Sequence, residues 1–226
     1  MRLIIVGAGI VGAACAYTAA ALGAEVILID AERPGRATAA GAGIICPWTA
    51  AVDDPAWYDF ARTAAREYPA LIAALADQGE PDVSYRRVGA LLLEQTDQPD
   101  QADVAQAARQ RLAARSAGAP EMGEVSLLDG TQAQELFPPL RPGAAAVHIA
   151  GAARVDGRQL AAALVRAAVR KGATVRTGAA TLSCHAGLVA GVSVADDLVE
   201  ADAGTAIRNT ERHPARRKVA RMTNPL

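Results

Sequence analysis

Cysteine is scarce in this sequence: Cys15, Cys46 and Cys184 stand far apart in a chain of 226 residues. They form no CxxC pair and no cluster with histidine, which excludes a disulfide-stapled scaffold and gives no sign of a metal site. A sparse, odd number of cysteines is typical of a reducing compartment. We therefore expect three inert buried thiols and no metal ligands.

Aromatic residues and net charge are also low. Phe, Trp and Tyr make up 4% of the chain, whereas hydrophobic residues, many of them alanine, make up 51%. This composition is typical of a soluble α/β protein whose core has few large side chains. The formal net charge is −1, so no long-range field would select nucleic acid or an anionic membrane. The length suffices for one large domain or two small ones.

One long segment, Leu3 to Ala24, has no charged residue, and Arg2 precedes it. Such a segment can be a signal peptide or a membrane span. Against both, many of its residues are alanine, and three glycines stand at the spacing of a dinucleotide-binding loop. The segment also runs directly into a second apolar strand. We therefore expect a cytoplasmic protein without a membrane span.

The N-terminus has the pattern of a strand, a glycine loop, a helix and a second strand. Arg2–Val6 and Glu25–Ile29 are short apolar runs, which favours buried parallel strands. Between them, Ile10–Leu22 is alanine-rich and favours a helix, which Gly23 ends. Asp30 closes the second strand. The loop between the first strand and the helix is the GxGxxG motif Gly7-Ala8-Gly9-Ile10-Val11-Gly12.

Each glycine of this motif has a physical role in binding a dinucleotide. Gly7 allows the tight turn, Gly9 lets a pyrophosphate approach the backbone, and Gly12 lets the helix pack against the strand. The helix N-terminus offers N–H groups and a positive dipole to phosphates. Asp30 stands at the spacing of the acid that binds a ribose hydroxyl, and its charge disfavours NADP. The motif leaves NAD and FAD open, and also a ligand-free glycine-rich turn.

Helices and strands alternate along the rest of the chain. We expect a helix over Ala56–Ala76 with a break or kink at Pro69, and an exposed helix over Gln101–Ser116. Asp156–Lys171 has an apolar stripe and is the clearest later helix, which Gly172 ends. The remaining expected elements are a short helix, Thr131–Leu136, the strands Val83–Tyr85, Gly89–Glu94, Ala144–Ile149, Ala173–Arg176 and Leu198–Ala203, and a hairpin of Thr181–Cys184 with Leu188–Val194.

A loop of small residues after Asp30 carries a family resemblance. Its sequence is Ala31-Glu32-Arg33 and then Gly35-Arg36-Ala37-Thr38-Ala39-Ala40-Gly41-Ala42-Gly43-Ile44-Ile45. It resembles the second FAD-contacting loop of the D-amino-acid oxidase superfamily, which includes glycine oxidase, sarcosine oxidase and D-amino-acid dehydrogenase. Small residues let backbone N–H groups approach phosphate and ring atoms closely. A flexible Ala/Gly linker is the alternative.

The resemblance implies FAD as the cofactor and assigns contacts by position. From ribose to flavin, these are Asp30 and Ala31, then Arg36, Ala37 and Thr38, then Ala42, Gly43 and Ile44. Thr181 falls where a backbone contact with adenine is usual in the family, although for this residue taken alone an ordinary strand position is the favoured interpretation. We can name no catalytic residue, because His148, His185 and His213 are expected to be structural or exposed.

The resemblance covers residues 1–203 and implies an α/β fold, an FAD-type Rossmann βαβ domain with an incomplete antiparallel-sheet substrate domain. We expect residues 1–80 and 151–204 to form the two parts of the FAD domain and residues 81–150 a partial substrate domain. Residues 205–226 are basic and are expected to be a disordered or aberrant tail. The tail has no aromatic residue for base stacking, so we expect no nucleic acid. Family members continue with a second half, which suggests a truncated or frame-shifted chain.

An intact family member is expected to oxidise the C–N bond of a small amino acid or secondary amine by hydride transfer to the flavin. The expected partner is this small-molecule substrate, and the oligomeric state is left open. Two other functions remain. An NAD-dependent Rossmann enzyme would need the GxGxxG motif but not the second loop. A non-catalytic remnant would bind an ADP-containing ligand or nothing.

Overall fold

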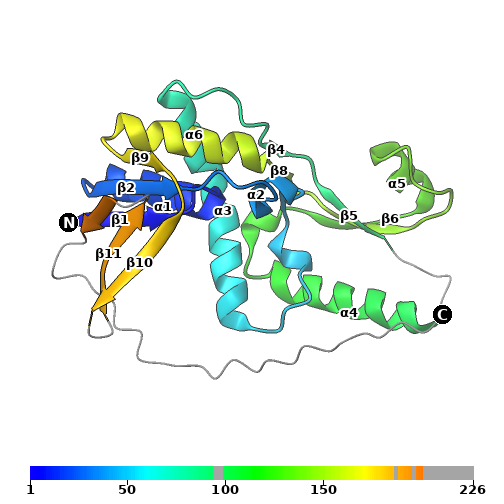
Figure 1. Ribbon diagram of the computed structural model, residues 1–226. Coiled ribbons are helices and arrows are strands. Elements are labelled where there is room, and N and C mark those ends of the chain that lie inside the picture. Colours follow the sequence, from blue (N-terminus) through cyan, green and yellow to red (C-terminus); the bar gives the residue numbers. More distant parts are fainter. Residues whose placement is uncertain (94–98, 186–187, 195–196, 201–226) are drawn as a thin grey trace, which may run out of the picture.

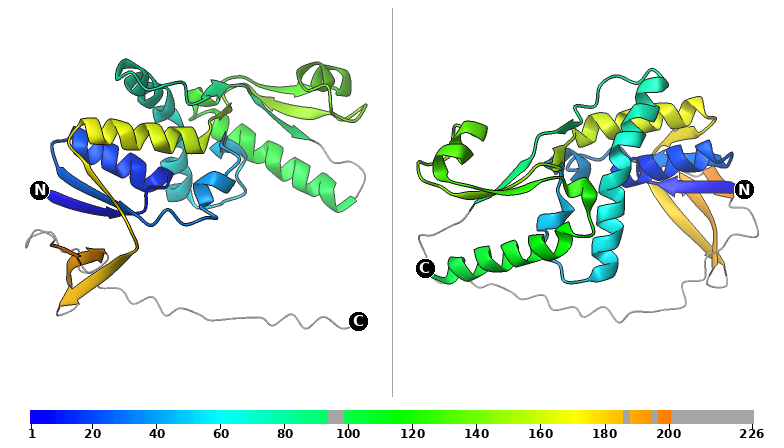
Figure 2. Two further views of the ribbon diagram at one scale, coloured as in Figure 1. Left: turned by 45° about the horizontal axis from the view of Figure 1, so that its top comes forward. Right: turned by 180° about the vertical axis from the view of Figure 1, so that it is seen from behind.

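The computed structural model describes residues 1–93, 99–185, 188–194 and 197–200 (Figure 1). Three strands, β1 (Arg2–Val6), β2 (Glu25–Asp30) and β9 (Thr174–Thr177), form a parallel sheet in the order β1-β2-β9. Helices α1 (Ile10–Ala21) and α6 (Gly157–Arg170) lie side by side over one face of it (Figure 2). The βαβ unit expected from the sequence is confirmed, and the later helix–glycine–strand segment adds α6 and β9 to it.

The two helices approach closely because alanines fill their interface. Ala13 and Ala16 of α1 and Ala163 and Ala167 of α6 have no exposed surface. Asp156 caps α6, since its Oδ1 accepts hydrogen bonds from the N–H groups of residues 158 and 159. The alanine-rich composition therefore builds a core from close backbone packing rather than from large side chains.

A second, antiparallel sheet covers the opposite face of the parallel sheet. It consists of β10 (Ala180–His185), β11 (Leu188–Val194) and β12 (Asp197–Glu200). Ile29 of β2 is completely buried against Val192 and Val194 of β11. The hairpin expected from the sequence is confirmed. The predicted final strand is described as far as residue 200, and the basic tail 205–226 lies outside the described residues.

A third sheet lies away from the parallel sheet, at the other end of the molecule (Figure 1). Its antiparallel strands are β5 (Ala90–Leu93), β7 (Ala146–Ile149) and β6 (Val125–Leu128), in the order β5-β7-β6. The helix α4 (Pro99–Ser116) covers one face, and α5 (Gly130–Leu136) follows β6. α4 is not exposed all round as expected, because Leu112 is buried with Trp48, Val147 and Ile149. Among the described residues, Pro47–Thr49 and Pro120–Met122 form 3₁₀ turns.

Short strands connect the two regions. β3 (Ile44–Ile45), β8 (Ala153–Arg154) and β4 (Arg86–Arg87) form a small antiparallel sheet in the order β3-β8-β4. The strand expected at Val83–Tyr85 is wrong, because β4 begins only at Arg86. The carbonyl of Val83 instead accepts a hydrogen bond from the N–H of Asp156 at 3.1 Å. The predicted loop before β3 also contains a one-turn helix, α2 (Ala37–Ala40).

The long helix α3 (Pro55–Asp77) is not interrupted at Pro69, so the expected break is wrong. A proline removes one backbone hydrogen bond. Here Leu71, Ile72 and Leu75 pack into the same core as α1 and α6, and this packing stabilises the second half of the helix.

A buried acid ties the residues after α3 to α6. The side chain of Glu80 is 2% exposed and accepts hydrogen bonds from Nε and Nη2 of Arg166, at 2.9 and 2.5 Å, and from Arg170. Burial raises the pKa of Glu80, but the hydrogen bonds and charges of the two arginines outweigh it, so the net pKa lies below its ordinary value. Glu80 is therefore held as a carboxylate.

Candidate dinucleotide-binding site

The glycine loop follows β1 directly and opens α1. The N–H of Gly7 donates to the carbonyl of Ile29 at 2.7 Å, and the φ of Gly7 is +102°, which a side chain would disfavour. A Cβ on Gly12 would stand 1.8 Å from the carbonyl oxygen of Gly7. The turn and the first turn of the helix therefore fit together only when both positions are glycine.

Asp30 connects the glycine loop to the loop after β2. Its Oδ2 accepts from the N–H of Ala8 at 2.5 Å, and its Oδ1 accepts from the N–H of Glu32 at 2.6 Å and from Nη2 of Arg36 at 2.7 Å. Burial raises the pKa of Asp30, but these hydrogen bonds and the charge of Arg36 outweigh it, and the pKa lies below its ordinary value. A carboxylate has about four acceptor positions, so one remains for a ligand hydroxyl.

Thr38 supplies the cap that α1 does not carry itself. The N-cap residue of α1 is Gly9, which has no side chain. Oγ1 of Thr38 accepts from the N–H of Ile10 at 2.9 Å. The hydroxyl proton of Thr38 stays available, because the oxygen acts only as acceptor in this bond. The first turn of α1 and the Thr38 hydroxyl together can donate several hydrogen bonds to an anion.

Further along the second loop, the backbone of Gly43 packs against the segment before α6. Its φ is +69°, its carbonyl accepts from the N–H of Val155 at 2.9 Å, and a Cβ would stand 1.9 Å from the carbonyl oxygen of Val155. The next residue, Ile44, is 72% exposed. The loop thus presents backbone and one apolar side chain at this end.

Two cavities meet at the glycine loop. One, of about 400 Å³, extends along the residues from Asp30 to Arg36 and reaches the start of β10. The other, of about 640 Å³, extends past α2 and the Gly43 segment toward α3. Val6 and Gly7 line both. The two cavities therefore share a wall at the carboxyl ends of β1 and β2, where open α/β sheets bind ligands, and we call the two together the path.

Most of the sequence-predicted residues lie on this path. The smaller cavity is lined by Gly7, Asp30, Ala31 and Arg36, and the larger one by Gly7, Gly9, Ile10, Val11, Gly12, Ala37, Thr38, Gly43 and Ile44. Ala8 lines a third cavity of about 370 Å³ on the α6 side. Ala42 and Thr181 line neither of these two cavities. The three residues before Thr181 in the chain, Gly178, Ala179 and Ala180, do line the smaller one.

Comparison with known proteins identifies the family. The family model described as FAD dependent oxidoreductase (DAO) matches residues 2–213. The chain belongs to this family. Its cofactor is FAD, which decides between the two dinucleotides that the GxGxxG motif leaves open.

Two similar proteins are informative about the FAD-dependent oxidoreductase fold. The uncharacterized oxidoreductase YurR of Bacillus subtilis (strain 168) is 44% identical over 200 residues, which are 88% of this chain and 52% of that protein. The structure of iminodiacetate oxidase (IdaA) from Chelativorans sp. BNC1 has a TM-score of 0.81 at 43% identity, over 89% of this chain and 53% of that one.

A more distant structure shares the fold. Glycine oxidase from Bacillus cereus ATCC 14579 has a TM-score of 0.72 at 20% identity, over 87% of this chain and 53% of that one. The chain spans about half the length of these three relatives. Its fold is therefore that of an FAD-type Rossmann domain with part of an antiparallel substrate-domain sheet.

The path fits FAD in shape and chemistry. A Cβ on Gly9 would come within 3.1 Å of Oγ1 of Thr38, so the bare glycine keeps the approach to the first turn of α1 open. The carboxylate of Asp30, which has the chemistry to accept a hydrogen bond from a hydroxyl, lines the smaller cavity, and Gly43 lines the larger one. An extended ligand with a diphosphate in its middle matches this order of groups.

The structure adds wall residues that the sequence pattern did not indicate. Cys15 of α1, Tyr68 of α3, and Val155 and Gly157 before and in α6 line the larger cavity. Tyr68 is not among the site residues that the sequence predicted. No sequence signal marks it, because its place in a helical apolar pattern is the same whether it faces the core or a cavity.

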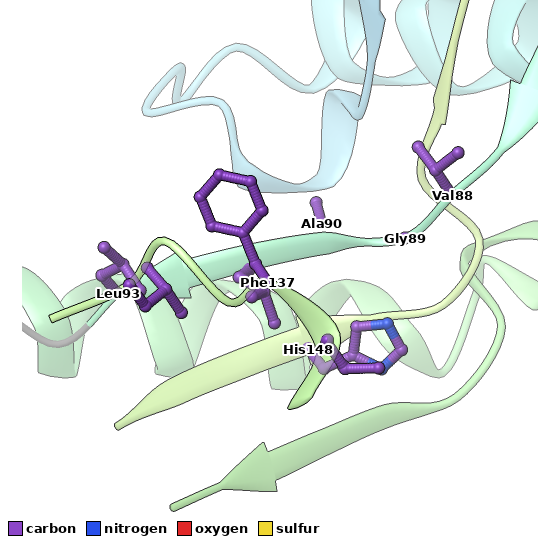
Figure 3. Close-up of a pocket in the computed structure, with 9 residues that line it drawn as sticks. Val88, Gly89, Ala90, Leu93, Phe137 and His148 are labelled. Carbon is purple, nitrogen blue, oxygen red and sulfur yellow. The ribbon is translucent and has the colours of Figure 1, made fainter. Parts of the chain in front are cut away.

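A separate, mostly apolar cavity of about 500 Å³ lies on the third sheet (Figure 3). Residues of β5 and the segment after α5 line it, and Phe137 is 52% exposed. His148 of β7 is the one titratable side chain on its wall among the described residues. A Cβ on Gly89 would stand 2.5 Å from Nε2 of His148, so the imidazole rests against the glycine backbone.

Of the other two histidines, His213 lies outside the described residues and the side chain of His185 is not described. Within the described ranges, no group of three His, Cys, Asp or Glu side chains could hold a metal ion. No helix among the described residues has both the length and the apolar character needed to cross a membrane.

Proposed function

We propose that this chain binds FAD along the two joined cavities, with the adenosine ribose at Asp30 and Ala31 and the pyrophosphate at the GxGxxG loop. The flavin half would then extend past Thr38 toward Gly43 and Ile44. The observation that carries the proposal is the junction of the cavities at Gly7. This arrangement would place the N-terminus of α1, which can bind an anion, between Asp30, which can bind a ribose hydroxyl, and the backbone around Gly43.

We further propose that the protein oxidises the C–N bond of an amino acid or a secondary amine. Bound FAD would accept a hydride from the carbon next to nitrogen, and water would then convert the resulting imine to an oxo acid and an amine. The support is the 43% identical structure named as an iminodiacetate oxidase, because iminodiacetate is a secondary amine with two carboxylates. The chain's own residues would bind and orient the cofactor, and we assign no catalytic residue.

The domain division and location belong to the same proposal. The third sheet lies within residues 81–150, and β9 returns to the parallel sheet from residues 151–204. This supports an FAD domain made from 1–80 and 151–204, with the substrate-domain segment between them. We place the protein in the cytoplasm because its cysteines are few and scattered.

The test is the visible spectrum of the purified chain after incubation with FAD and removal of the excess. Retained flavin absorption, with no retention of NADH under the same conditions, is the expected result. Anaerobic addition of glycine, sarcosine, D-alanine or iminodiacetate then asks which amine bleaches the flavin. A folded chain, judged by far-UV circular dichroism, that retains NADH but no flavin would refute the proposal.

A further inference from the structure

The wall of the larger cavity includes a tyrosine whose hydroxyl group the site described above does not use. Three of its wall residues, Cys15, Thr38 and Tyr68, carry a polar side-chain atom. Thr38 already belongs to the site described above, where its Oγ1 accepts from the N–H of Ile10. A thiol is only a weak donor. The phenol of Tyr68 makes no hydrogen bond to the part of the chain that the structure describes.

Tyr68 is held in one orientation by its surroundings. Its ring stacks on that of Tyr85, with centroids 6.0 Å apart and an interplanar angle of 8°. It also packs against the core cluster that contains Val155 and Leu160. Burial, and secondly the neighbouring Tyr85, raise the pKa of Tyr68. The phenol is therefore a neutral, positioned donor, and Tyr68 lines a cavity that Tyr85 does not line.

The position of Tyr68 indicates which half of FAD it would contact. It lines the cavity that contains Gly41, Gly43 and Ile44, and it does not line the cavity that contains Asp30. The flavin half of FAD carries ribityl hydroxyls and ring carbonyls, which accept hydrogen bonds, whereas the ADP half would lie on the other side of the glycine loop.

We propose that Tyr68 is a cofactor-binding residue whose hydroxyl donates a hydrogen bond to the flavin half of FAD, either to the ribityl chain or to a ring carbonyl. This inference rests on the proposed binding of FAD. It gives α3, the long helix otherwise concerned with packing, a direct part in selecting a flavin nucleotide over ADP.

The experiment compares Tyr68→Phe with Tyr85→Phe, which removes the same hydroxyl from the partner of the stacked pair. Dissociation constants for FAD and for ADP are measured on each protein by titration calorimetry. One hydrogen bond corresponds to a change of roughly two- to tenfold. Tyr68→Phe is expected to weaken FAD binding by about this factor and to leave ADP binding unchanged. Tyr85→Phe is expected to change neither.

Each other outcome overturns the inference in a distinguishable way. Equal FAD affinity in the wild type and in Tyr68→Phe removes the role of Tyr68 and leaves the proposed function standing. Equal weakening of FAD and ADP, or loss of the far-UV dichroism signal, makes Tyr68 a structural residue. Absence of FAD binding by the folded wild-type chain refutes both the inference and the proposed function.

Discussion

Replacement of Gly9 by alanine is expected to weaken FAD binding strongly while it lowers the stability of the fold only a little. The backbone of Gly9 has φ −67° and ψ 179°, which any residue adopts, so the substitution brings no backbone strain. The new methyl group would lie 3.1 Å from Oγ1 of Thr38. A small movement of that side chain relieves the contact and at most breaks its bond to the N–H of Ile10. The expected loss of stability is therefore about 1 kcal/mol.

The effect on FAD binding is expected to be much larger. The methyl group would stand where a pyrophosphate has to approach the first turn of α1. A hydrogen bond to a charged group contributes about 1.5–3 kcal/mol. The loss of two such bonds amounts to roughly 3–6 kcal/mol, or at least a hundredfold in the dissociation constant at about 1.4 kcal/mol per factor of ten.

Titrations with FAD and with ADP measure this effect, and urea unfolding measures stability. Gly118→Ala is the matched control, because its Cβ would meet only the end of the Arg62 side chain at 3.8 Å, away from the cavities. Gly12→Ala is a contrasting variant, since its Cβ would stand 1.8 Å from the backbone oxygen of Gly7 and should impair folding itself. If Gly9→Ala binds FAD within about threefold of the wild type, the glycine loop does not hold the pyrophosphate.

Three further predictions concern named side chains. Asp30→Asn should weaken ADP binding. Because the pKa of Asp30 lies below its ordinary 3.8, its contribution to stability should be present above about pH 4 and disappear as the pH falls through the lowered value. Glu80→Gln should lower the free energy of unfolding by about 2 kcal/mol, since it removes the charge that Arg166 binds. Gly89→Ala should cost about 1–2 kcal/mol for its φ of +72° and displace His148, visible as a shift of its NMR signals.

Each of these has a contradicting result. A difference in the free energy of unfolding between wild type and Asp30→Asn that does not shrink as the pH falls through the lowered pKa of Asp30 would show that the carboxylate's charge is not the cause. If Glu80→Gln lowers the free energy of unfolding by less than about 0.5 kcal/mol, Arg166 and Arg170 interact mainly with water rather than with Glu80. In the double variant Gly89→Ala/His148→Ala, the stability lost through the contact between the new methyl group and His148 should be recovered. The stability lost through the positive φ of residue 89 should not.

The sequence predicted the first βαβ unit almost to the residue, and it named many of the residues that line the two cavities. β1 has the predicted bounds, α1 ends one residue early and β2 one residue late. These elements are local: an apolar run, an alanine-rich segment and glycines at fixed offsets each specify a conformation over a few neighbouring residues. The GxGxxG glycines and Asp30 follow from the same register.

Only the tertiary structure decided which distant residues complete the site. Thr38 caps α1 from 28 positions away, the carbonyl of Val155 makes Gly43 obligatory, and Tyr68 reaches the cavity from α3. The same is true of the unbroken helix at Pro69, where burial of one face outweighs a lost backbone hydrogen bond. Such contacts join segments far apart in the chain, and they depend on how the helices and sheets pack, which local pattern and propensity do not specify.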